Sequence, residues 1–130
     1  MIELQLADEI LARIRARGGQ YDERSYLFVL AAIEYAQVRL PVRRHLSGVE
    51  LSWACRDLAL ERFGLLARPV LGHWGITRTD DLGRIVFTLV EVGLLVTQPS
   101  DAESDFRDVF DFASAFDGGY AWDGVRRGRG

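Results

Sequence analysis

The chain has 130 residues, a mass of 14.7 kDa and a formal net charge of −3, which predicts one domain with a single core. Hydrophobic residues make up 48% of it and charged residues 27%, so the composition excludes a disordered chain, a collagen-like chain and a disulfide scaffold. All sixteen basic residues are arginine and asparagine is absent, which excludes a Schiff-base lysine, a phosphate-loop lysine and an Asn-linked glycan.

Two helices are predicted in the first forty residues. Asp8 can cap a first helix that ends at Gly18-Gly19 and has apolar residues at helical spacing on one face. Asp22 can cap a second helix from about residue 23 to 38, and Pro41 stops it. The middle of this second helix is apolar on every side, which predicts a position at the centre of the fold.

A capping box predicts where the third helix begins. Ser47 and Glu50 stand at the Ser-x-x-Glu spacing, in which each side chain accepts a hydrogen bond from a backbone N–H that the helix leaves unpaired. The helix is expected to run to Phe63, and Gly64 can end it in a left-handed conformation. Cys55 falls on the inner stripe, so it is interpreted as a small buried hydrophobic residue rather than a nucleophile.

A short helix and a longer one should follow. The short helix contains Pro69 and Trp74 and is broken at Gly75. Thr79 can cap the longer helix, which carries two aspartates in its first turn and is closed by Gly93.

The segment after the fifth helix predicts a β-hairpin. Residues 94–98 are rich in β-branched and apolar side chains, residues 99–101 form a turn sequence, and residues 105–112 partly alternate. The expected fold is therefore mainly α with a small C-terminal β-hairpin, either winged-helix-like or a compact helical bundle that carries the hairpin. In this interpretation residues 1–112 form one globular helical domain and residues 113–130 form a tail.

The C-terminal part has an unusual composition. Residues 101–123 contain seven acidic residues and one arginine, interleaved with six aromatic residues, and three arginines follow in the last seven residues. Exposed aromatic rings supply contact area in protein interfaces, and acidic residues keep such a segment in solution. Three aromatic residues of the tail are therefore candidate partner-binding residues: Phe116, Tyr120 and Trp122. The alternative is that these rings pack on the domain's own core.

Five short stretches between residues 44 and 112 form a specific pattern: Arg44-His45-Leu46-Ser47-Gly48-Val49-Glu50-Leu51, Ala59-Leu60-Glu61-Arg62-Phe63-Gly64, His73-Trp74-Gly75-Ile76, Ile85-Val86-Phe87 with Leu89-Val90-Glu91, and Asp105-Phe106-Arg107-Asp108-Val109-Phe110-Asp111-Phe112. With them, the chain resembles a family of small, uncharacterised bacterial proteins associated with planctomycete and verrucomicrobial genomes. The resemblance covers about half of the chain. It implies no activity, cofactor or catalytic residue.

The residues able to bind a metal ion are few and unsuitably spaced. The chain has two histidines and one cysteine, and none of the usual ligand spacings occurs, so neither a metal site nor a cofactor is predicted. His45, beside the capping box, is interpreted as a capping or hydrogen-bonding residue, with a proton shuttle as the alternative. His73 and Trp74, at the end of the short helix, are the other weak functional candidates.

The expected location is the cytoplasm. A single cysteine cannot form an intrachain disulfide, and no apolar run is long enough to span a membrane. The first residues also lack the basic start and apolar middle of a signal peptide.

These features favour a non-catalytic protein-binding module, an adaptor or interaction domain whose partner is another protein. A winged-helix protein that binds nucleic acid is the first alternative. The outward residues of its would-be reader helix carry a net charge of −2, whereas nucleic-acid binding depends on arginine and lysine, so this partner is disfavoured. An enzyme of undetermined type is the second alternative.

Overall fold

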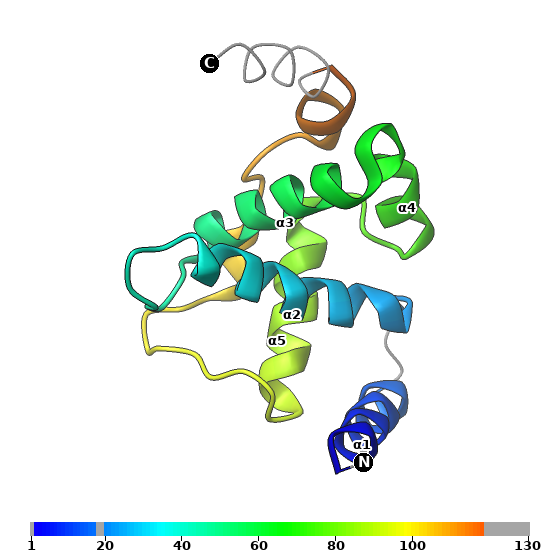
Figure 1. Cartoon of the computed structure of the whole chain (residues 1–130), viewed down its shortest axis with the longest axis vertical. Helices are drawn as coiled ribbons and strands as arrows, with labels where there is room; N and C mark the ends of the chain where they lie inside the picture. The colour runs from blue at the N-terminus through cyan, green and yellow to red at the C-terminus, as the bar shows by residue number, and fades with distance from the viewer. Residues whose placement is uncertain (1, 18–19, 119–130) are drawn as a thin grey trace.

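The computed structural model describes residues 2–17 and 20–118, which fold into an all-helical arrangement (Figure 1). The mainly helical character predicted from the sequence is confirmed. The helices of the described residues, in chain order, are α1 (Ile2–Ala16), α2 (Glu23–Val38), α3 (Gly48–Phe63), the 3-10 turn η1 (Gly64–Leu66), α4 (Ala67–His73), α5 (Thr79–Glu91), the 3-10 turn η2 (Glu103–Phe106) and the π-helical turn η3 (Ala113–Gly118).

Helices α2 and α3 lie side by side, and α5 crosses behind both of them (Figure 1). The core lies between these three helices and includes the fully buried side chains of Phe28, Leu82 and Ile85. The apolar middle of α2 is therefore central, as its sequence predicts. Cys55 of α3 is also buried, at 2% exposure, which confirms its interpretation as a core residue.

Several helix boundaries follow from the local sequence. Asp22 is the N-cap of α2, and its carboxylate accepts from the N–H of Arg24 at 2.9 Å. At the start of α3 the side chain of Ser47 accepts from the N–H of Glu50 at 3.0 Å, and the carboxylate of Glu50 accepts from the N–H of Ser47 at 2.9 Å. Gly64 ends α3 at a φ of +54°, in the left-handed region that favours glycine.

Two helix starts differ from the sequence prediction. Helix α1 begins before Asp8, which lies within it. Thr79 is the first helical residue of α5 rather than its cap, and it is 1% exposed. Its hydroxyl donates to the carbonyl of Phe106 at 2.6 Å and accepts from the N–H of Val109 at 3.0 Å. The carboxylate of Asp81 instead accepts from two backbone N–H groups that precede the helix.

The predicted β-hairpin and winged-helix fold are wrong. No strand occurs in residues 2–17 or 20–118: residues 94–98 have no regular structure, and residues 105–112 leave η2 as a series of turns.

The physical reason is that Phe106 inserts between two helices instead of facing a partner strand. Gly48 of α3 and Gly83 of α5 leave room for it: a Cβ on Gly83 would lie 3.0 Å from the Cβ of Phe106. On Gly48 a Cβ would lie 3.1 Å from its ring. Phe106 therefore packs into the space that a glycine leaves on each of two helices. The rules that predict strands from an alternating pattern do not consider such spaces.

Candidate functional site

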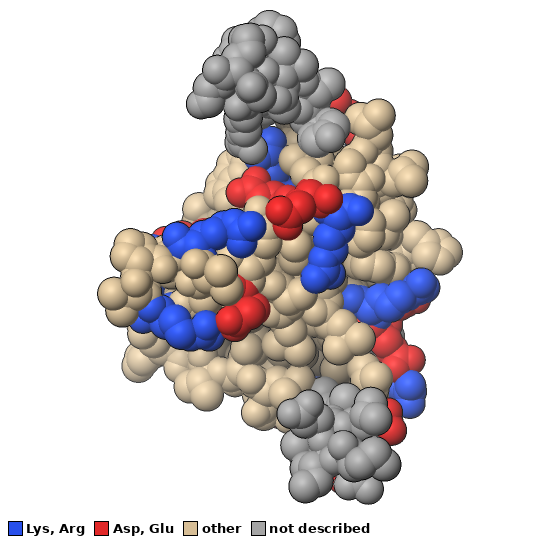
Figure 2. All heavy atoms as spheres, viewed as in Figure 1, with Lys and Arg blue, Asp and Glu red and all other residues tan. Residues whose placement is uncertain are grey.

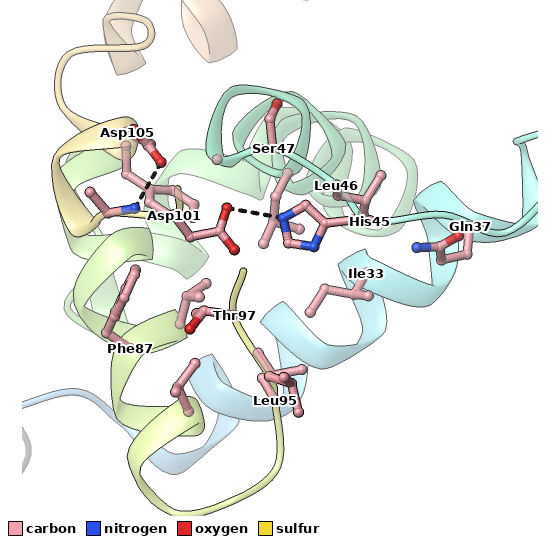
Figure 3. A pocket seen from close by; sticks show the side chains of 17 residues that line it. Ile33, Gln37, His45, Leu46, Ser47, Phe87, Leu95, Thr97, Asp101 and Asp105 are labelled. Carbon is pink, nitrogen blue, oxygen red and sulfur yellow. Dashed lines mark hydrogen bonds and ion pairs between the residues drawn. The ribbon is translucent and has the colours of Figure 1, made fainter. Parts of the chain in front are cut away.

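A cavity of about 160 Å³ opens at one end of the helical core (Figure 3). Its wall combines α2, the loop from α2 to α3, the first turns of α3, the second half of α5 and the segment that follows α5. We call it the His45 pocket. Its apolar wall comes mainly from the following side chains: Ile33, Leu51, Val86, Phe87, Val90 and Leu95.

The loop that carries His45 is fixed by Gln37 near the end of α2. The Gln37 amide donates to the carbonyl of Arg44 at 2.5 Å and accepts from the N–H of the same residue at 3.1 Å. The guanidinium of Arg44 in turn makes a two-pronged contact with Glu50, at 2.6 and 3.0 Å. The loop is therefore tied to both neighbouring helices, which sets the position of the imidazole.

The opposite wall is residues 94–101, which we call the pocket loop. It begins after Gly93, whose φ of +87° ends α5 in a left-handed conformation. It closes in a small turn, in which the carboxylate of Asp101 accepts from the N–H of Gln98 at 2.7 Å. Just beyond it, Asp105 accepts from the N–H of Ala102 at 2.9 Å and so starts η2.

His45 and Asp101 point toward each other across the pocket and join the two loops (Figure 3). Nε2 of His45 lies 3.0 Å from Oδ1 of Asp101, and the two side chains are 34% and 19% exposed. The N–H of Gln98 and, to a smaller extent, the imidazole of His45 lower the pKa of Asp101 below its ordinary value. At neutral pH the carboxylate is therefore ionised, and Nε2–H of His45 donates to it.

The pocket offers hydrogen-bonding groups beside an apolar wall. Within the described residues, no three histidine, cysteine, aspartate or glutamate side chains gather in a way that could hold a metal ion. The hydroxyl of Ser47, which also lines the pocket, accepts a hydrogen bond from the N–H of Glu50. Cys55 lies elsewhere in the core, and burial raises the pKa of its thiol. In the described part of the chain, the hydrogen bond of the His45 ring goes to a carboxylate and not to a hydroxyl or thiol.

The other two weak candidates, His73 and Trp74, lie away from this pocket. His73 is the last residue of α4 and is exposed. Trp74 is 9% exposed, and its ring lies 5.8 Å, between centroids, from those of both Phe28 and Phe63. It is thus part of the core in this structure.

Of the three aromatic residues proposed for partner binding, only Phe116 is described. It is 3% exposed and packs edge to face on Phe112, with ring centroids 4.9 Å apart. Its ring therefore covers the core, and Arg68 of α4 pairs with the adjacent Asp117. Tyr120 and Trp122 lie outside the described residues.

The sequence singles out His45 but not its partner, Asp101. Asp101 is 56 positions away from His45, at the start of an acidic run. The one local signal was its place at the end of a Pro99-Ser100-Asp101 turn, which predicts a side-chain bond to the turn but not to a histidine.

Comparisons with protein-family models, with curated proteins and with solved structures found no match for the chain. The family resemblance seen in the sequence therefore stays a prediction. No helix among the described residues combines the length and the hydropathy needed to cross a membrane.

Proposed function

We propose that this chain is a non-catalytic protein-binding domain that holds one apolar side chain of a partner protein in the His45 pocket. The observation that carries the proposal is the combination of a small apolar cavity with a fixed hydrogen-bonded pair, His45 and Asp101, at its edge. Sites of this type bind through the apolar wall and orient the ligand through the polar groups.

The size of the pocket favours a single side chain. Its volume of about 160 Å³ is close to the roughly 150 Å³ of an engineered protein cavity that holds benzene. Pockets for drug-sized ligands measure about 300 to 1,000 Å³. A phenyl ring or a branched aliphatic side chain therefore matches the His45 pocket better than a nucleotide or a larger cofactor does.

Two exposed apolar residues lie on the two loops that contribute to the pocket wall. Val96, in its wall, is 90% exposed, and Val42, in the loop that also carries His45, is 75% exposed. Apolar side chains next to a pocket add contact area around a buried anchor residue, as in protein interfaces. A partner polypeptide can use both features at once.

Nucleic acid is not the partner that we propose. Ten arginines of the described residues form an ion pair with a carboxylate, among them Arg39 with Glu61 and Arg43 with Glu34. Figure 2 shows the result over α2 and α3, where arginines and acidic residues alternate on the surface. Binding to phosphates depends on clustered basic side chains, and this face does not present a continuous stripe of them.

The test is peptide selection against the full chain and a variant with a filled pocket. Val90 of α5 lines the pocket, so Val90→Phe should occupy it with a ring. Val38→Phe is the matched control, since it adds the same ring at a 69% exposed position outside the pocket lining. Peptides selected from a random library on the wild type should bind the control equally and the Val90→Phe variant at least tenfold more weakly.

The thermal unfolding of both variants should first be compared with the wild type, so that a loss of binding cannot come from a loss of fold. Peptides that bind the wild type and Val90→Phe with equal affinity would contradict the proposal. So would a selection that enriches no peptide with an apolar residue at a constant position.

A further inference from the structure

The lining of the His45 pocket has an uneven charge. Seventeen residues form it, and they include two carboxylates, Asp101 and Asp105, but no arginine, in a chain with sixteen arginines. The nearby Arg44 is already paired with Glu50. Even with His45 protonated, two negative charges face at most one positive charge, so the lining is net negative in either state of the imidazole.

The two carboxylates differ in what they can still bind. Both oxygens of Asp101 are occupied, one by His45 and the other by the N–H of Gln98. Asp105 uses one oxygen to accept from the N–H of Ala102, and no hydrogen bond or ion pair among the described residues involves its second oxygen. Asp105 is also exposed, so this oxygen can accept a further hydrogen bond.

From this charge distribution we infer that the pocket takes an apolar side chain that stands next to a cationic group, in a partner segment where a hydrophobic residue adjoins an arginine or lysine. The apolar side chain enters the cavity and the cation meets Asp105. The inference rests on the proposed function and adds the chemistry of the partner. Charge complementarity at a rim mainly selects among partners, because an exposed ion pair contributes little affinity.

Three small probes of similar size and different charge can test it: 2-phenylethylammonium, 2-phenylethanol and 3-phenylpropanoate. Each is titrated into the isotopically labelled full chain, and the amide chemical shifts give the affinity and the location of binding. The expected order is cation, then alcohol, then anion. The cation should bind roughly two- to fivefold more tightly than the alcohol, the range of an exposed ion pair. Added salt should weaken the binding of the cation, strengthen that of the anion and leave that of the alcohol unchanged.

Two variants locate the effect. Asp105→Asn keeps a side-chain oxygen for the N–H of Ala102 and removes the charge, so the cation should lose its preference while the alcohol binds as before. Glu61→Gln is the matched control, because it removes an exposed carboxylate from the distant part of α3, and it should leave all three affinities unchanged.

The outcomes separate the inference from the proposed function. If the alcohol binds with shifts in the pocket and the cation binds no better, the inference is overturned and the proposed function stands. If the anion binds best, the inference is overturned with the opposite charge preference. If no probe shifts the pocket amides, the proposed function fails together with the inference.

Discussion

Two segments that follow α5 differ in how they pack on the rest of the chain. The pocket loop, residues 94–101, and the aromatic segment, residues 110–116, both contain apolar side chains and lack regular α-helical or β-strand structure over most of their length. In the pocket loop Val96 is 90% exposed, whereas in the aromatic segment Phe112 and Phe116 are 5% and 3% exposed.

The difference lies in what each segment packs against. In the aromatic segment the ring centroid of Phe110 lies 4.5 Å from that of Trp53 of α3, and Phe112 and Phe116 pack on each other. The pocket loop has a polar link to the neighbouring loop, between Asp101 and His45, and a cavity lies behind it. Apolar composition alone therefore does not decide whether a segment becomes part of the core; a complementary surface does.

The largest effect should come from Phe116→Ala in the aromatic segment. Removal of a buried phenylalanine ring destabilises a protein by about 3 to 5 kcal/mol, because apolar contacts are lost and a cavity remains. For Phe116 we expect a loss of about 3 kcal/mol, since the π-helical turn around it can relax partly. Chemical denaturation, monitored by far-ultraviolet circular dichroism, measures it.

A chain that ends after Gly118 is the control for this prediction. It keeps Phe116 and the ion pair between Arg68 and Asp117, so its free energy of unfolding should exceed that of Phe116→Ala. A chain that ends after Phe112 should lose as much stability as Phe116→Ala or more. If this shorter chain were as stable as the full chain, the ring of Phe116 would not be part of the core.

The next largest loss of stability is expected for Thr79→Val. The Thr79 hydroxyl links the start of α5 to the end of η2 and the residues that follow it. Valine has nearly the shape of threonine, but it leaves the carbonyl of Phe106 and the N–H of Val109 without their partner. An unsatisfied buried polar group costs about 1 to 3 kcal/mol. We expect a loss of about 2 kcal/mol in the free energy of unfolding. Thr88→Val serves as the comparison, because its hydroxyl bonds only within α5 and is partly exposed, and it should change stability by less than about 0.5 kcal/mol.

The sequence predicts those parts of this fold that depend on neighbouring residues. The starts of α2 and α3 follow from Asp22 and from the Ser47 and Glu50 pair, whose bonds span at most three positions. The ends at Gly64 and Gly93 follow from the freedom of glycine to adopt a positive φ. Each of these features is decided within one helical turn, so no tertiary information is needed.

The sequence does not predict contacts between distant segments. The hairpin prediction used the alternation in residues 105–112, but the gaps at Gly48 and Gly83 that receive Phe106 lie in other helices. In the same way, nothing in the local sequence places Asp101 beside His45. The candidate site is made by these long-range contacts, so its wall and the pairing of its polar groups are not predictable, although the sequence singles out His45.

A smaller effect on stability is expected for Asp101→Ala in the pocket loop. Its two hydrogen bonds are near the surface, where such interactions contribute about 1 kcal/mol or less. Amide hydrogen exchange should show the change locally: the N–H of Gln98 loses the carboxylate that accepts its hydrogen bond and should exchange faster, while the amides of α3 keep their rates. Val96→Ser, at a 90% exposed position of the same loop, should leave both measurements unchanged.

The smallest effect concerns the pH dependence of the link between His45 and Asp101. The N–H of Gln98 and the imidazole hold the pKa of Asp101 below 3.8, its ordinary value, in the folded chain. A carboxylate with a lowered pKa in the folded state adds stability above the pKa that it has in the unfolded chain, and this stability is lost as the pH falls through the folded value. The unfolding temperature of the wild type should therefore exceed that of Asp101→Asn at about pH 5, and the difference should shrink as the pH falls below about 4.

Two other carboxylates, Asp22 and Glu50, have pKa values lowered to about 2, but they are present in both proteins, so their effects cancel in the comparison. A difference that stays constant down to about pH 2.5 would show that the ionised form of Asp101 does not hold the pocket loop. A difference near zero at every pH would show that asparagine makes the same hydrogen bonds as the carboxylate.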